Sequence, residues 1–154
     1  MARADFKGHP KVDQLINVVD NHFRSHESPQ STRVMIFSQY RHSVEEIVKC
    51  LKRTSDVVKP MGFVGQGSTS SKGLTQQEQL KVVSDFKAGG YNTLVCTSIG
   101  EEGLDIGEVD LIVCFDSQSS PTRMLQRMGR TGRARAVHKL QPNKNKKYAY
   151  VLLI

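Results

Sequence analysis

The apolar run "RVMIF", residues 33–37, gives the clearest indication of how this chain folds. Its apolar side chains follow one another without polar residues between them, which is typical of a strand buried on both faces. Such strands occur in parallel sheets, because connecting helices cover both faces of the sheet. The run therefore predicts a parallel sheet enclosed by helices.

Helical and extended patterns alternate on both sides of this run. A helix is predicted upstream, because apolar residues recur at helical spacing from Val12 to Phe23 and Pro10 suits a first helical turn. Further strands are predicted at "GFV" (62–64), "TLVC" (93–96), "LIVCF" (111–115) and "YAYVLLI" (148–154). The alternation favours an α/β fold of three layers with right-handed crossovers.

Two capping boxes locate the helices between these strands. Ser43 with Glu46 matches this motif, in which each side chain accepts a hydrogen bond from the other residue's backbone N–H. Thr75 with Glu78 matches it a second time, and glycines follow at 89–90, where a helix can end. We therefore expect one helix to begin at Ser43 and another at Thr75.

Length and composition suit a single globular domain over residues 1–154, with residues 1–8 and 139–147 expected to be flexible. The net charge of +7 is unevenly distributed, because residues 117–154 hold nine Lys or Arg and no acidic residue. A basic surface of this kind is typical of nucleic-acid or polyphosphate binding, although a solvated basic tail gives the same count. No apolar run is long enough to span a membrane, and three cysteines without a CxxC pair favour an intracellular protein.

The segments that directly follow the predicted strands are rich in hydroxyl, amide and glycine residues. They are "SQYR" (38–41), "GQGS" (65–68), "TSIGEEGLDIG" (97–107) and "DSQSSPT" (116–122). In a parallel α/β sheet such segments border the ligand crevice, where N–H and hydroxyl donors can hold phosphates. Strand ends are rich in turn residues in every protein, so each segment alone is a weak indication.

A helix that begins near Pro121 is predicted to end in the arginine-rich stretch "LQRMGRTGRAR", residues 125–135. Gln126 and Arg130 share one helical face, and Arg133 joins them if the helix continues. Glycines inside a helix cost about 1 kcal/mol each, so close approach of a backbone or a phosphate is expected there. Arginines on a rigid helix end can stabilise the charge on a γ-phosphate during its transfer. The alternative is a solvated basic helix that binds nucleic acid by charge alone.

Three of these segments resemble motifs of superfamily 2 helicases. "RVMIFSQYR" (33–41) resembles motif IV, "TLVCTSIGEEGLDIGEVDLIVCFD" (93–116) resembles motif V, and "QRMGRTGR" (126–133) resembles motif VI. The segments "GFVGQ", "GLTQQEQLKVVSDFKAGGYNTLV" and "GEEGLDIGEVDLI" are similar to the Fanconi anaemia M and Hef helicases and translocases. The resemblance runs from about His9 to Arg135 and implies their second RecA-like lobe, a three-layer αβα sandwich with a mostly parallel sheet.

The resemblance implies that this lobe completes an ATP site. Gln126, Arg130 and Arg133 of motif VI would be the catalytic residues, with the two arginines as fingers that reach the γ-phosphate. Gly103 and Asp105 of motif V would approach the ribose of the nucleotide. The alternative for Asp105 is an ordinary turn residue.

The resemblance also implies a grip on the phosphates of a DNA strand. The residues that would form it are Ser38, Gln39, Arg41, Gly65, Gln66, Thr97 and Ser98. Contacts of this kind hold a strand without reading its sequence. The alternative for Thr97 is an ordinary strand end.

The chain has no P-loop motif of its own. In "GQGSTSSKGLT" (65–75) the lysine precedes glycine and leucine, whereas a P-loop needs Gly-Lys followed by Ser or Thr. No acidic box for Mg²⁺ is evident either, and His22 with His26 lacks a third ligand, so no metal is expected to bind this chain. We expect ATP and Mg²⁺ to be held mainly by the first RecA-like lobe of the same protein, and the isolated chain to be inactive as an ATPase.

Together these features favour the second motor lobe of an ATP-dependent DNA helicase or translocase that acts on forked or branched DNA in repair. The expected partners are DNA and the first lobe, with no membrane, and the expected location is the nucleus, or the cytoplasm of an archaeon. Two alternatives are open. One is the same lobe of an RNA-directed helicase of the Dicer or RIG-I type, because phosphate contacts do not report the sugar. The other is a non-enzymatic fragment that binds nucleic acid.

Overall fold

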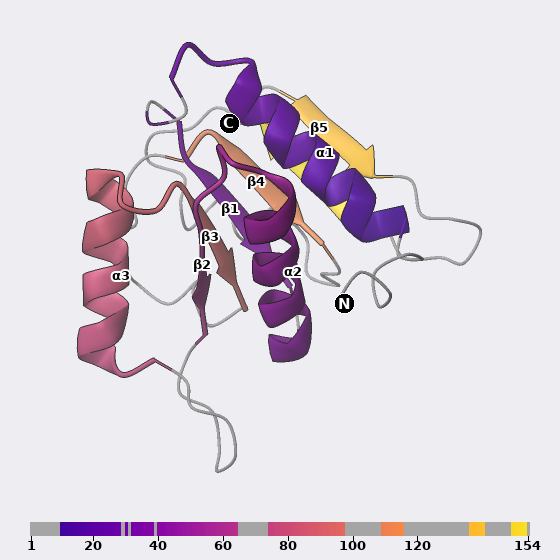
Figure 1. Cartoon of the computed structure of the whole chain (residues 1–154). Helices are drawn as coiled ribbons and strands as arrows, with labels where there is room; N and C mark the ends of the chain where they lie inside the picture. The colour runs from indigo at the N-terminus through magenta and orange to yellow at the C-terminus, as the bar shows by residue number, and fades with distance from the viewer. Residues whose placement is uncertain are drawn as a thin grey trace.

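Helices and strands alternate along most of the chain, as the sequence predicts (Figure 1). The computed structural model describes residues 10–28, 30, 32–38, 40–64, 74–97, 109–115, 136–140 and 149–153. The elements in these ranges are α1 (Pro10–Arg24), β1 (Val34–Phe37), α2 (Arg41–Thr54), β2 (Pro60–Phe63), α3 (Gln76–Ala88), β3 (Thr93–Cys96), β4 (Leu111–Cys114), β5 (Ala136–Leu140) and β6 (Ala149–Leu153). The helix predicted from Pro121 lies outside the described residues. None of the described helices is both long and apolar enough to cross a membrane.

The strands of the described ranges form one six-stranded sheet in the order β2-β3-β1-β4-β6-β5. β2, β3, β1 and β4 run parallel, and β6 pairs antiparallel with both β4 and β5. β1 lies between β3 and β4, with Phe37 in register with Cys96 on one side and with Cys114 on the other. The predicted mostly parallel sheet is confirmed, and the apolar run 33–37 contributes one of its central strands.

Helices cover both faces of the sheet, which explains why β1 is apolar throughout. Val34 and Ile36 pack with α1 and α2 on one face, whereas Met35 and Phe37 pack with α3 on the other. None of these four side chains is more than 3% exposed. Figure 1 shows α3 on the opposite side of the strands from α1 and α2. The predicted three-layer αβα sandwich is confirmed.

The capping box predicted at the start of α3 is present. Thr75 Oγ1 accepts a hydrogen bond from Glu78 N at 3.2 Å, and Glu78 Oε2 accepts one from Thr75 N at 2.7 Å. The helix ends at Gly89, whose φ of 93° is left-handed, as the glycine pair predicts. Arg33, the residue before β1, donates from Nε to the carbonyl oxygen of Phe86 at 2.9 Å. It thereby provides a hydrogen-bond donor for a carbonyl group in the last turn of α3.

The capping box predicted at Ser43 and Glu46 is wrong. The N-cap of α2 is Tyr40, and Val44 N already donates to Tyr40 O at 3.1 Å, so Ser43 lies inside the helix. Glu46 Oε1 instead lies 2.9 Å from Nε2 of His42, four residues earlier on the same helix. The hydroxyl and carboxylate spacing of a capping box also occurs within a helix, and here α2 begins at Arg41, two residues before Ser43.

The main differences from the predicted strands concern β2 and β5. β2 begins at Pro60, ahead of the predicted segment 62–64. β5 was not predicted, and it pairs with β6 through an antiparallel register that includes Val137↔Leu152. β5 includes residues 139 and 140, at the start of the range expected to be flexible, whereas residues 1–8 and 141–147 lie outside the described residues.

A hydrogen-bonded network joins the segments that lead into β1 and β4. Thr32 Oγ1 donates to Asp110 Oδ2 at 2.7 Å, and Arg33 N donates to the same oxygen at 3.1 Å. The Thr32 hydroxyl proton is used in that bond, so His22 Nε2, which lies 2.8 Å from Thr32 Oγ1, must be the donor to Thr32. The network ties the end of α1 to two central strands at the amino edge of the sheet.

Candidate nucleic-acid interface

Ser38 and Thr97 lie side by side where β1 and β3 end. The register pairs Phe37 with Cys96, and Ser38 N donates to Cys96 O at 2.9 Å, so the parallel pairing continues past both strands. Both residues are buried, at 2% and 5% exposed. The structure therefore brings together two of the residues predicted to hold a strand phosphate, one from motif IV and one from motif V.

The alternation of side chains along a strand decides which face these hydroxyls occupy. Ile36 and Val95 pack with α1 and α2, so Ser38 and Thr97, two residues further along each strand, continue on that face. α2 starts just after this point, and its N-cap residue Tyr40 makes no side-chain cap hydrogen bond. The N-terminus of a helix offers N–H donors and a partial positive charge, both of which favour a phosphate.

The Thr97 hydroxyl is the unusual group at this edge. Thr97 Oγ1 is buried and has no hydrogen-bond partner within the described part of the chain. A buried unpaired hydroxyl costs about 1–3 kcal/mol, so native structures rarely keep one without a reason. Because a hydroxyl can donate to a phosphate oxygen, an anion bound at the strand ends would satisfy this atom.

Cys96, the residue before Thr97, has an unreactive thiol. Complete burial raises the pKa of the Cys96 thiol, which therefore stays neutral and is not a nucleophile. The polar chemistry at the end of β3 is thus confined to the Thr97 hydroxyl.

Two helices carry a basic residue in the first turn, near the carboxyl edge of the sheet. Arg41 is the first residue of α2. Lys11, in the first turn of α1, places Nζ 4.5 Å from the centre of the Phe115 ring, directly after β4, in a cation–π contact. Lys11 was not among the residues predicted from the sequence. Its position in a first helical turn was visible there, but its pairing with Phe115 depends on the tertiary fold.

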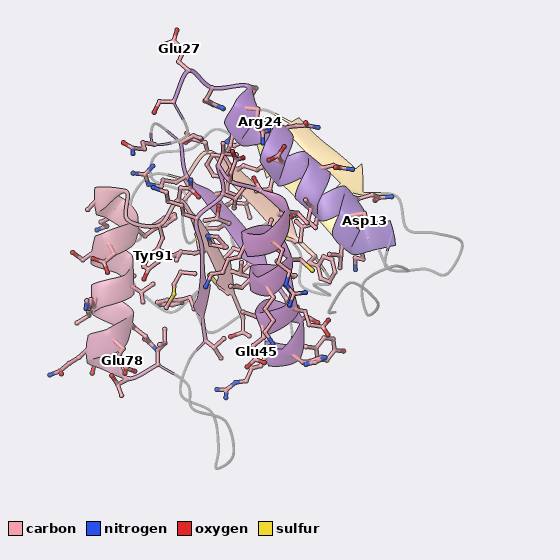
Figure 2. The ribbon with its side chains drawn as sticks, in the orientation of Figure 1. Asp13, Arg24, Glu27, Glu45, Glu78 and Tyr91 are labelled. Carbon is pink, nitrogen blue, oxygen red and sulfur yellow. The ribbon has the colours of Figure 1, made fainter. Side chains whose placement is uncertain are left out.

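All three described helices start toward this edge. In Figure 2, Glu45 of α2 and Glu78 of α3 lie near the lower end of the molecule, and Asp13 lies below Arg24 along α1. The positive ends of the helix dipoles therefore point toward the carboxyl edge, and that of α2, which starts directly after Ser38 and Tyr40, favours an anion there.

Most of the predicted site lies outside the described residues. These positions are Gln39, Gly65, Gln66, Ser98, Gly103, Asp105, Gln126, Arg130 and Arg133. Ser38, Arg41 and Thr97 are the predicted site residues that the structure describes, and all three lie at the carboxyl ends of β1 and β3 or at the adjoining start of α2.

The histidine pair on α1 is occupied by hydrogen bonds. The rings of His22 and His26 are 4.5 Å apart, and His26 Nδ1 donates to the carbonyl oxygen of His22 at 2.7 Å. Within the described ranges, no group of three or more His, Cys, Asp or Glu side chains is arranged to hold a metal ion.

Comparison with known proteins identifies the family. The model of the helicase conserved C-terminal domain matches residues 10–135. The chain is 56% identical to the ATP-dependent DNA helicase mph1 of Aspergillus fumigatus over 142 residues, which cover 86% of this chain and 13% of that protein. It is 53% identical to the protein of the same name from Sclerotinia sclerotiorum, over 87% of this chain and 12% of that protein. The chain thus spans about an eighth of the curated relatives that it matches.

Solved structures agree with this assignment. The helicase domain of Pyrococcus furiosus Hef superposes with a TM-score of 0.64 at 39% identity, over 81% of this chain and 24% of that one. Domain 2 of the DEAD-box helicase Mss116p, solved with an RNA duplex, superposes with a TM-score of 0.62 at 20% identity, over 82% of this chain and 46% of that one, which supports the fold alone. The chain belongs to the helicase conserved C-terminal domain family, as a second RecA-like domain of superfamily 2 of the Fanconi anaemia M and Hef type.

Proposed function

We propose that this chain is the second motor lobe of an ATP-dependent DNA helicase or translocase that acts on forked or branched DNA in repair, in the nucleus. The hydroxyl of Thr97 beside Ser38 carries this proposal: it is buried without a hydrogen-bond partner among the described residues, which favours a phosphate at the strand ends where motifs IV and V meet. The fungal relatives, which are named ATP-dependent DNA helicases, support DNA as the bound strand.

In this proposal the strand grip is built on two interior strands of the sheet. Ser38 and Thr97 follow strands that are paired on both sides and covered on the face where these hydroxyls lie. The other contacts would come from Gln39, Arg41, Gly65, Gln66 and Ser98. Hydroxyls, amides and N–H groups that bind phosphates fix the position of a strand and carry no sequence information, as a motor that moves along any sequence requires.

The ATP contacts of this lobe would come from motifs V and VI. Arg130 and Arg133 would act as arginine fingers, because a planar guanidinium donates to two phosphate oxygens at once. Gln126 would order the γ-phosphate and the attacking water, and Gly103 and Asp105 would approach the ribose. ATP supplies the γ-phosphoryl group that is transferred to water, and Mg²⁺ would be held by the first lobe.

Coupling between the two ligands would run through the segment between β3 and β4. Thr97 at its start would contact the strand, and Asp105 further along would contact the nucleotide. Closure of the two lobes on ATP and their release after hydrolysis would therefore shift the strand grip of this lobe relative to that of the first lobe. Repetition of this cycle would move the protein along DNA.

An RNA-directed helicase lobe is the second candidate, because phosphate contacts alone do not distinguish the sugar. A non-enzymatic module that binds nucleic acid is the third. DNA is favoured by the relatives at 53–56% identity, whose names specify DNA, whereas the neighbour solved with RNA is only 20% identical.

ATP hydrolysis by a protein in which this chain follows a first RecA-like lobe tests the proposal. We expect phosphate release that branched DNA stimulates more than matched RNA, and no measurable release by this chain alone, because arginine fingers act on a nucleotide that the first lobe binds. Strong turnover by the chain alone would contradict the assignment as one lobe of two. A clear preference for RNA would favour the second candidate.

A further inference from the structure

Tyr40 occupies a position that local structure does not explain. It is the N-cap of α2, where Ser, Thr, Asp and Asn are favoured because their side chains bond to the first N–H groups of the helix. Tyrosine cannot do this, and Tyr40 makes no side-chain cap hydrogen bond. Helix stability therefore does not account for an aromatic residue here.

Packing does not account for the Tyr40 ring either. Its exposed fraction is 54%, and within the described part of the chain its side chain has no hydrogen bond and its ring has no aromatic or cation–π contact. Leu80 on α3, at 53%, is the other large apolar side chain that is exposed among the described residues. A protein interface needs a patch of apolar side chains at its centre, whereas a single exposed ring suits a planar ligand.

The surroundings of Tyr40 indicate which planar ligand it would meet. Tyr40 N donates to Ser38 Oγ at 3.4 Å, so the backbone of Tyr40 is fixed next to a hydroxyl assigned above to a strand phosphate. Arg41 follows it directly, at the start of α2. A strand whose phosphates lie against Ser38 and the first turn of α2 carries its bases within the neighbourhood of this ring.

We propose that Tyr40 is a base-stacking residue, whose ring packs against one nucleobase of the strand held at the ends of β1 and β3. This role rests on the proposed function and adds a contact to a base where the other assigned contacts are to phosphates. Every base has a π face, so stacking tolerates any sequence. One stacked base contributes modestly to affinity, so it can be released at each step of a motor.

The test compares DNA with and without bases. A short labelled single strand of mixed sequence, and the same strand made of abasic sites, are titrated with this chain at several salt concentrations, and Kd is read from fluorescence anisotropy. Tyr40→Ala should weaken binding to the base-bearing strand about tenfold, and Tyr40→Phe should stay within about twofold of wild type. The slope of log Kd against log salt should be unchanged, since no charge is lost.

Three further arms make the result specific. On the abasic strand, wild type and Tyr40→Ala should bind alike, because no base is present to stack. Leu80→Ala removes an equally exposed apolar side chain from α3 and should leave both affinities unchanged. The unfolding temperature of Tyr40→Ala should stay close to that of wild type, because the ring is 54% exposed and has no hydrogen bond, aromatic contact or cation–π contact within the described part of the chain.

The outcomes separate this role from the proposed function. Absence of salt-dependent DNA binding by the wild-type chain would overturn both. Normal wild-type binding with an unchanged Kd for Tyr40→Ala would overturn the stacking role alone. A loss that persists on the abasic strand would also overturn it, and would assign the ring to a contact with protein.

Discussion

Replacing Thr97 by valine should stabilise the folded chain while weakening its hold on DNA. Valine has nearly the shape of threonine and puts a methyl group where the Thr97 hydroxyl is buried without a partner in the described part of the chain. Since a buried unpaired hydroxyl costs about 1–3 kcal/mol, the free energy of unfolding should rise by about 1 kcal/mol after allowance for imperfect fit. For a chain of this size that corresponds to an increase of about 2–4 °C in Tm.

Thr93→Val is the matched control for this substitution. Thr93 is the first residue of β3, the strand that Thr97 follows, and is completely buried, but its Oγ1 donates to Asn92 Oδ1 at 3.1 Å. The same chemical change there removes a hydrogen bond and should lower the free energy of unfolding by about 1 kcal/mol. Urea denaturation followed by circular dichroism measures both variants, and the m-value should be unchanged in each because the area exposed on unfolding is the same.

The functional half of the Thr97 prediction needs DNA. A hydrogen bond to a charged group is worth about 1.5–3 kcal/mol, so Thr97→Val should weaken DNA binding about tenfold or more, and Thr97→Ser should retain most of it. Loss of stability in Thr97→Val would show that the hydroxyl already has a partner in the folded chain. Higher stability with unchanged DNA affinity would show that no strand phosphate binds there, and either result refutes the reasoning.

Two further predictions address the ATP site and the amino edge of the sheet. In a protein that contains both lobes, Arg130→Ala or Arg133→Ala should lower kcat at least about a hundredfold at saturating DNA, with little change in DNA affinity. Arg130→Lys should have the same low kcat, because lysine lacks the planar guanidinium. A loss of DNA affinity with intact kcat would instead make motif VI a basic DNA-binding patch. The pKa of His22 is lowered by burial and by the neighbouring His26, and Asp110 opposes this shift. His22 therefore binds a proton more readily in the unfolded chain than in the folded chain. The free energy of unfolding should accordingly fall as pH drops from about 7 to 5. Urea denaturation across that range should show a smaller fall for His22→Gln, and an equal fall would assign the effect to another group.

The sequence predicts those features that depend on local pattern. Residues 34–37 are all apolar because helices cover both faces of β1, so the burial of this strand can be recognised from the sequence alone. Thr75 and Glu78 also form their capping box as predicted, since the motif spans only a few residues. Ser43 and Glu46 match the same motif and do not form it, because α2 begins at Arg41 and Ser43 therefore lies inside the helix.

Features that depend on contacts distant in sequence were not predictable in this way. The pairing of β5 with β6, the contact between Lys11 and Phe115, and the exposure of Tyr40 all depend on how elements assemble. The family resemblance suggested Ser38 and Thr97 separately. Their placement side by side follows from the register of β1 and β3, which no local pattern contains.

The position of the strand grip explains how this lobe would transmit movement. β1 is hydrogen-bonded to β3 on one side and to β4 on the other, with helices against both faces, so displacing Ser38 or Thr97 relative to the core would break central sheet pairing. Interiors of this kind are close-packed and deform little, so we expect the lobe to move as a unit. In the proposed motor the step must therefore arise between the two lobes. The Thr97 hydroxyl, which has no partner in the described part of the chain, would lower stability while it provides a phosphate contact at a fixed point of this lobe.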